Sequence, residues 1–318
     1  MNPNRPLNFK KAGEDGFTFI ELLVVLATVA VLAVLLLPAI AGTKPNSQAF
    51  QCLENQRQLI LSWQMYAEDN TDLLPPNDSP YFTAYASSAN KSQLKNWVVG
   101  TMEQALDARD APASMVGGVS ELLDPNTLLS PYITNKLVYH CPADNYKNPL
   151  NNNRVNVRSY SMNSAVGTVW YTSSAYTAGG PPLGTAVQGG WLPGSSYNAN
   201  QTSWLTYGKM SSFTGPGPAN TFVIMDENPI SINDGSTAIP AATVGNGGYL
   251  IDYPSGNHGE SAAVAFADGH VIIHKWQNPE TYTPIVSQGQ GGNPPAQPLT
   301  DPNNPDLAYL AHITSAPR

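Results

Sequence analysis

A run of apolar residues from Phe17 to Ile40 constrains this 318-residue chain more than any other feature. As an α-helix the run would be about 36 Å long, which is enough to cross a hydrocarbon core of about 30 Å. Arg5, Lys10 and Lys11 precede it. The positive-inside rule therefore predicts a single membrane pass with a cytoplasmic N-terminus and an exported body. One carboxylate, Glu21, interrupts the run near its start.

Two simpler kinds of segment also contain such a run. A secretory signal peptide would be cleaved at the small residues of Ala39-Ile40-Ala41 and leave Gly42 first, but its apolar region is usually about 7 to 15 residues long. A plain single-pass anchor fits the length. Neither segment accounts for Glu21, unless its side chain extends to the lipid–water interface.

The residues from Gly16 to Leu22 (GFTFIEL) resemble the processing site of type IV pilins and type II secretion pseudopilins. In that family a membrane peptidase cleaves after the glycine and methylates the new N-terminus. The resemblance therefore implies a leader of residues 1–16 and a mature chain that begins with methylated Phe17. It also implies that Glu21 pairs with the terminal amine of a neighbouring subunit, which would neutralise a carboxylate inside a membrane helix.

The same resemblance implies a function and a location. We expect a pseudopilin-like structural subunit, not an enzyme, that prepilin peptidase/methyltransferase processes. Other pilin or pseudopilin subunits would join it in a type II secretion or type IV pilus-like filament. The chain would lie in the bacterial inner membrane with a periplasmic body, or in a filament at the cell surface. The alternative is a membrane-tethered binding module whose segment 161–203 captures a glycan or a protein.

The pattern beyond the apolar run predicts an α+β fold in which a long N-terminal helix packs on an antiparallel β-sheet with loop-rich insertions. A mostly apolar stripe at three- and four-residue steps predicts an amphipathic helix over residues 41–70. This stripe comprises Ala49, Cys52, Leu53, Gln56, Ile60, Trp63 and Ala67.

Four further boundaries follow from composition. The membrane helix, which the resemblance implies is also the filament core, is assigned to residues 17–40, and the globular domain to residues 71–276. Within the globular domain, residues 161–203 are rich in Gly, Ser, Tyr, Asn and Pro and are predicted to form a loop-rich insertion. Residues 277–318 are predicted to be a flexible tail with one short helix, over Asp306 to Ile313, that docks back on the body.

The clearest strand pair joins residues 261–267 to residues 270–276 through Asp268-Gly269. This dipeptide predicts a two-residue hairpin turn. The resulting register places Phe266 opposite Val271 on an apolar face. A second β-rich run covers Thr221 to Met225 and ends at acidic residues and a proline.

Charge and motifs exclude several classes of function. The formal charge is −8, only 12% of residues are charged, and Lys and Arg form no cluster. Nucleic-acid binding depends on such clusters, so we expect no nucleic-acid partner. The G-x-S-x-G, H-E-x-x-H and phosphate-loop motifs of hydrolases and nucleotide-binding proteins are absent from the sequence.

The histidines offer little catalytic chemistry. His258 and Asp268 are ten positions apart, a spacing of about 33 Å in an extended strand, so we predict no catalytic dyad. His270 and His274 would lie on the strand face opposite Phe266. They would be about 13 Å apart, which is too far to share one zinc ion.

We predict no cofactor, with calcium as the alternative. Hard oxygen donors gather in and near one loop, although their spacing matches no EF-hand. These donors are Asp226, Glu227, Asn233, Asp234 and Asp252. The two cysteines, Cys52 and Cys141, lack the spacing of a zinc motif. Because export favours oxidation, we expect either a Cys52–Cys141 disulfide or two buried thiols.

The body resembles a narrower group, the prepilin-type proteins of planctomycete and verrucomicrobial lineages that contain an H-x9-D-G element. That element runs here from His258 to Gly269. Other matching pieces are Met65 to Asn70, Cys141 to Asp144, Ser159 to Asn163, Asp226 to Pro229, Ser231 to Gly235 and Phe266 to His270. The resemblance is thus spread over most of the chain.

Overall fold

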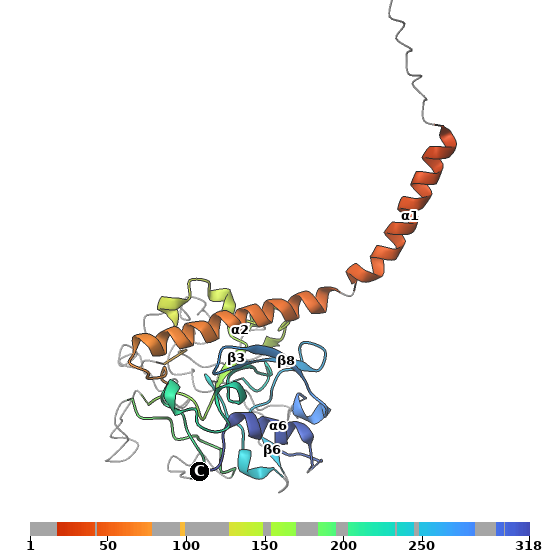
Figure 1. Ribbon diagram of the computed structural model, residues 1–318. Coiled ribbons are helices and arrows are strands. Elements are labelled where there is room, and N and C mark those ends of the chain that lie inside the picture. Colours follow the sequence, from red (N-terminus) through yellow and green to blue (C-terminus); the bar gives the residue numbers. More distant parts are fainter. Residues whose placement is uncertain are drawn as a thin grey trace, which may run out of the picture. The chain divides into compact units, whose positions relative to one another are not determined.

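A computed structural model describes the chain in eleven stretches (Figure 1). The described residues are 18–41, 43–77, 96–98, 127–148, 154–169, 184–194, 203–232, 234–244, 248–283, 297–301 and 303–318. The predicted leader, Gly16 and Phe17 lie outside them. The chain divides into two compact units, Met1–Lys44 and Pro45–Arg318.

The first unit contains helix α1, Phe19–Ala41. Its start is a capping box: the Thr18 hydroxyl accepts a hydrogen bond from the Glu21 backbone N–H at 3.3 Å, and the Thr18 backbone N–H donates to the Glu21 carboxylate at 2.8 Å. From Thr18 to Val31, where the described side chains of this unit end, every side chain is exposed. None of the helices in the described residues is long and apolar enough to cross a membrane.

The amphipathic helix predicted over residues 41–70 is confirmed as α2, Thr43–Asp69. Five positions of the predicted stripe are buried, namely Cys52, Gln56, Ile60, Trp63 and Ala67. The helix ends because Thr71 and Asp72 adopt left-handed backbone angles, with φ of 55° and 74°.

The second unit is built around a five-stranded sheet with the order β5-β3-β4-β7-β8. Its strands are β3 Tyr160–Asn163, β4 Phe222–Asp226, β5 Ser236–Thr237, β7 Ser261–Phe266 and β8 Val271–Lys275. The neighbours pair antiparallel except β3 and β5, which are parallel. The fold is thus α+β as predicted, but the sheet is mixed rather than wholly antiparallel. The short edge strand β5 is the exception.

Smaller elements surround this sheet. Two two-stranded sheets pair β1 Lys147–Asn148 with β2 Arg154–Val155, and β6 Tyr249–Leu250 with β9 Gln297–Pro298. Short 3-10 helices are η3 Ser130–Tyr132, η4 Lys136–Tyr139, η6 Met210–Ser212, η7 Pro218–Asn220, η8 Ala241–Thr243 and η9 Pro279–Thr281. The last helix, α6, covers Pro305–Thr314.

Helices cover both faces of the five-stranded sheet (Figure 1). On one face the buried stripe of α2 packs on the sheet, and Gln56 Nε2 donates a hydrogen bond to the Ala263 carbonyl at 3.0 Å. On the other face, α6 inserts Leu307 and Leu310 against Phe222 and its neighbours. Burial of these apolar side chains on both faces is the main force that holds the layers together.

The predicted hairpin register was wrong by one residue. Val271 pairs with Ala265 instead of Phe266, because the connection is a three-residue loop closed by a hydrogen bond from Phe266 N–H to the His270 carbonyl. Gly269 supplies the left-handed position of such a loop, with φ of 95°. The shift turns His270 to the same face as Phe266, where the two rings stack at 4.3 Å.

Two predicted boundaries also need correction. The loop-rich insertion 161–203 begins too early, because β3 and the following Ala165 and Val166 are fully buried in the core beneath α2. The predicted tail 277–318 contains the expected helix, α6, which docks on the body as predicted and joins its core, so the end of the chain is not a flexible tail. Asp306 at its first turn accepts hydrogen bonds from the backbone N–H groups of Gln277 and Asn278. Residues 170–183, 195–202 and 284–296 lie outside the described residues.

A histidine at the α6 contact predicts a pH dependence of stability. The His274 ring stacks on Tyr309 of α6 at 3.9 Å, and burial lowers the pKa of His274, with Asp306 opposing this shift in part. The unfolded chain therefore binds this proton more tightly. The contribution of His274 to stability is complete above the ordinary histidine pKa of about 6.5 and is lost as the pH falls below it.

We expect the melting temperature to fall between neutral pH and about pH 5, and to fall less in His274→Phe, which keeps the ring contact but cannot bind the proton. Differential scanning fluorimetry across this range measures the effect. The matched control is His312→Phe on the exposed side of α6, which should behave like the wild-type chain. An equal fall in His274→Phe and the wild-type chain would contradict the assignment.

Candidate metal centre

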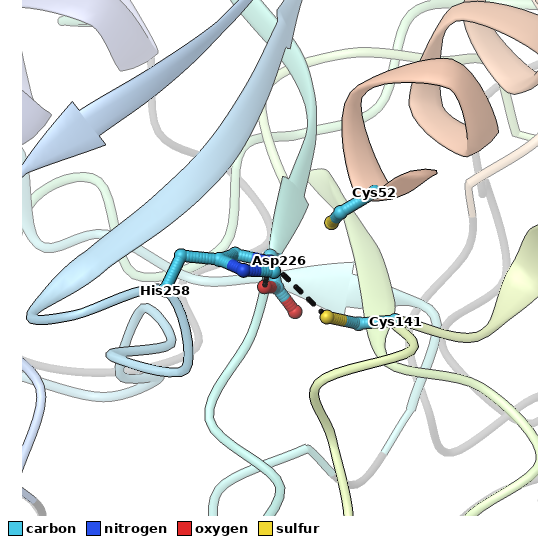
Figure 2. Close-up of side chains that lie close together, drawn as sticks. All are labelled: Cys52, Cys141, Asp226 and His258. Carbon is cyan, nitrogen blue, oxygen red and sulfur yellow. Dashed lines mark hydrogen bonds and ion pairs between the residues drawn. The ribbon is translucent and has the colours of Figure 1, made fainter. Parts of the chain in front are cut away.

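Four side chains from four separate segments meet beneath α2. They are Cys52, Cys141, Asp226 and His258, and one ligand atom from each lies within 4.8 Å of all the others (Figure 2). The three residues Cys52, Cys141 and Asp226 are fully buried, and the His258 side chain is only 1% exposed. A cluster of two thiols, a carboxyl and an imidazole has thus been formed away from solvent.

Each of these side chains is held by its own element. Cys52 lies on the buried stripe of α2, and Asp226 is the last residue of β4. Alternation along β4 puts Asp226 on the same face as Ile224, beneath α2. Cys141 follows η4 at a proline turn, and His258 lies in the loop that enters β7.

The distances within the cluster approach those of a tetrahedral metal site. His258 Nε2 lies 3.2 Å from Cys141 Sγ and 3.6 Å from Asp226 Oδ2. Around a zinc ion with bonds of about 2.0 to 2.3 Å, tetrahedral ligands lie roughly 3.3 to 3.8 Å apart. The two measured separations are thus within a few tenths of an ångström of that range, and every other pair of ligand atoms lies within 4.8 Å.

Several polar atoms of the cluster are buried without a hydrogen bond. By distance and angle, neither carboxylate oxygen of Asp226 nor Nδ1 of His258 makes a hydrogen bond among the described residues, although burial and the Cys141 thiol raise the pKa of Asp226 and the Ser255 hydroxyl lowers it. Buried polar groups of this kind are uncommon, because each loses its bonds to water without replacement. The carboxylate is the more telling case, since it is fully buried and its nearest cluster neighbours are a thiol and an imidazole.

The surroundings of the cluster favour the uncharged forms of its side chains. Burial raises the pKa of Asp226 well above its usual range and lowers the pKa of His258, which leaves a free lone pair on the imidazole. The neighbouring Cys52 thiol, followed by burial, raises the pKa of Cys141. Backbone N–H groups of Ala143 and Asp144 act in the opposite direction on Cys141, because they donate toward its sulfur. A bound cation would favour the ionised forms.

The cluster is not arranged for nucleophilic catalysis. In a Cys-His-Asp triad the thiol and the carboxylate contact different nitrogens of the imidazole. Here Cys141 and Asp226 both face Nε2 of His258, while Nδ1 has no partner in the described residues. Both sulfurs are also fully buried, so a substrate has no access to them. The arrangement is instead that of a closed ligand set.

The structure places the predicted cysteines side by side as free, buried thiols, the second of the two alternatives expected from sequence. Of the predicted calcium donors, Glu227 and Asp234 lie close enough for Asp234 to raise the pKa of Glu227, but no group of three acidic donors is gathered around them in the described part of the chain. Glu227 faces away from Asp226 and accepts hydrogen bonds from Ser161 and Ser231. Carboxylates of two other predicted donors accept backbone N–H groups, Asp234 from Ser236 and Asp252 from Ala238. Asn233 lies outside the described residues.

The predicted separation of His258 and Asp268 is confirmed, because β7 lies between them. Asp268 pairs instead with His270 at 2.6 Å on the exposed hairpin. Sequence reasoning missed the partnership of His258 with Asp226 and the two cysteines. The four residues share no local motif, although Cys141, Asp226 and His258 each begin one of the short pieces that resemble prepilin-type proteins.

Comparison with protein-family models, with curated proteins and with solved structures finds no match to this chain. The similarity to pilins therefore depends on the sequence pieces named above. Of the predicted processing and assembly residues, Glu21 lies in the first turn of α1, whereas Gly16 and Phe17 lie outside the described residues.

Proposed function

We propose that the chain is a pseudopilin-like structural subunit that assembles through its N-terminal helix into a type II secretion or type IV pilus-like filament. The observation that supports this most is the sequence Gly16 to Glu21 directly before and within the first turn of an apolar helix. A chain cleaved after Gly16 would start two residues before α1. Its terminal amine would then lie near the end of the helix at which Glu21 stands.

The side chains of α1 support an intermolecular role. From Phe19 to Val31 they are apolar with few exceptions, and all are exposed. An exposed apolar surface of this extent needs a cover of lipid or of neighbouring subunits. We propose that the inner membrane covers it before assembly and that the helices of other pilin or pseudopilin subunits cover it afterwards.

The second unit supports a structural role in another way. Among the described residues, its two hydrophobic cores are formed by residues from Cys52 onward, so the unit has cores of its own. Under this proposal the body lies in the periplasm or on the filament surface. The binding-module alternative depends on segment 161–203, much of which lies outside the described residues, and no contact in the described part favours it.

The mass of the mature N-terminus tests the proposal. After co-expression with a prepilin peptidase/methyltransferase, we expect the purified chain to begin at Phe17 and to bear an N-methyl group. Gly16→Leu, which puts a bulky side chain at the cleavage site, should retain residues 1–16. A wild-type chain that begins at Gly42 would show conventional secretion instead, and one that begins at Met1 would show that the site is not processed.

A further inference from the structure

We propose that Cys52, Cys141, Asp226 and His258 bind one Zn²⁺ ion in a closed, four-coordinate structural site. The proposal is independent of filament assembly. It depends on the convergence of four ligand atoms within 4.8 Å in the buried space beneath α2 (Figure 2). Among the described residues this is the one group of three or more potential ligands that lies close enough to share an ion.

The donor set selects zinc among the common cations. Two thiolates, one imidazole and one carboxylate suit the borderline-soft Zn²⁺ ion, which is usually four-coordinate in structural sites. Calcium takes six to eight oxygen ligands, and magnesium requires octahedral oxygen coordination, so this set satisfies neither. With four protein ligands and no exposed donor, the site has no open position for a substrate. A structural role therefore fits better than a catalytic one.

The surrounding groups would stabilise the charge of the loaded site. Two thiolates and one carboxylate around Zn²⁺ leave one net negative charge. The Tyr160 hydroxyl lies 3.2 Å from Cys52 Sγ, and the backbone N–H groups of Ala143 and Asp144 are directed at Cys141. Such donors to coordinating sulfur spread negative charge into the protein and fix the orientation of the ligands.

A disulfide explains less of the arrangement than a metal ion does. Bonding Cys52 to Cys141 would use both sulfurs, but it would give the fully buried carboxyl group of Asp226 no new partner. It would also leave unexplained why the imidazole of His258 turns one nitrogen toward both Cys141 and Asp226. One zinc ion would engage all four side chains together.

The ion would join α2 to the rest of the body. Cys52 comes from the helix, whereas Cys141, Asp226 and His258 come from a turn, a strand end and a loop of the sheet layer. The four ligands are far apart along the chain and would not form a site in the unfolded state. Binding of zinc therefore favours the folded state, as it does in other structural sites.

The test begins with the full chain, purified in detergent without a polyhistidine tag or chelator. Elemental analysis by mass spectrometry is expected to find one zinc per chain, with little calcium, magnesium or iron. Asp226→Asn and His258→Gln change the ligand chemistry with little change of shape, and both should lose stoichiometric zinc. The matched control is Asp268→Asn with His270→Gln, which alters an exposed pair of the same residue types and should keep it.

Cobalt substitution keeps the proposal testable if a variant fails to fold. Replacement of the metal in the wild-type chain with Co²⁺ should produce the visible bands of a tetrahedral ion and the charge-transfer bands of thiolate ligands. The proposal is overturned if the wild-type chain binds neither metal, if mass spectrometry finds a Cys52–Cys141 disulfide in the purified protein, or if the ligand variants retain zinc as the control does. A failed N-terminal mass test would leave this result unaffected.

Discussion

Glu21→Gln is expected to abolish filament assembly while the start of α1 stays intact. Glutamine can accept the hydrogen bonds that Glu21 accepts from Thr18 in the capping box, so the helix keeps its cap. It cannot provide the negative charge that the terminal amine of a neighbouring subunit would meet in the filament core. Electron microscopy and sedimentation of sheared filaments measure assembly, and mass spectrometry verifies that each variant is still cleaved after Gly16.

The capping box also supplies the control for this experiment. Thr18→Ala removes the hydroxyl that accepts a hydrogen bond from the Glu21 N–H, but it leaves the charge of Glu21 in place. If Glu21 serves assembly through its charge, Thr18→Ala assembles and Glu21→Gln does not. The reverse outcome would show that Glu21 is retained as a helix cap, and the assembly mechanism would then be wrong.

The parts of the fold that sequence predicted are those with a strong local pattern. The stripe from Ala49 to Ala67 repeats at helical spacing, and its buried face is the face that the structure packs on the sheet. The terminal helix was predicted within one residue at each end because Pro305 and Asp306 provide a helix start and apolar residues follow. For both helices, the residues that determine the structure lie within a few positions of one another in the sequence.

The predictions were wrong where one residue decides the strand register, or where a side chain depends on partners that are distant in the sequence. The dipeptide Asp268-Gly269 is typical of a two-residue turn, but here Ala267 is also part of the loop and the strand register shifts by one residue. The shift moves His270 to the sheet face that carries Phe266. The burial of β3 was missed because its sequence, Tyr160 to Asn163, is polar in half of its positions. Ser161 and Asn163 are buried because Glu227, Phe222 and Thr314 provide hydrogen-bond partners from elsewhere in the chain.

The candidate metal centre was missed because its four side chains are distant from one another in the sequence. Local zinc motifs place cysteines two residues apart, and two lone cysteines do not meet that criterion. Here Cys141 and His258 are 117 residues apart in sequence, and the packing of α2 on the sheet brings Cys52 to them. Only the tertiary structure contains that information.

Arg158→Met is expected to lower the free energy of unfolding by about 3 to 5 kcal/mol, the usual cost of removing one member of a buried charged group. Arg158 is fully buried, and its guanidinium donates hydrogen bonds to the carbonyls of Tyr160 at 2.5 Å and Asp234 at 2.6 Å. It also lies 5.9 Å from the centre of the Trp97 ring. Methionine would fill much of the space but leave both carbonyls without these donors.

The interaction of Arg158 with Glu227 gives a second, more specific test of the role of Arg158. Burial raises the pKa of Glu227 to about 8, and the Arg158 charge acts against that rise, so the two groups should be energetically coupled. Urea denaturation followed by tryptophan fluorescence should show a coupling of about 0.5 to 3 kcal/mol between Arg158→Met and Glu227→Gln. Arg57→Met, which breaks an exposed ion pair with Glu54 on α2, should change stability by no more than about 1 kcal/mol. Equal effects of Arg158→Met and Arg57→Met would show that the buried arginine is not a structural support of the sheet.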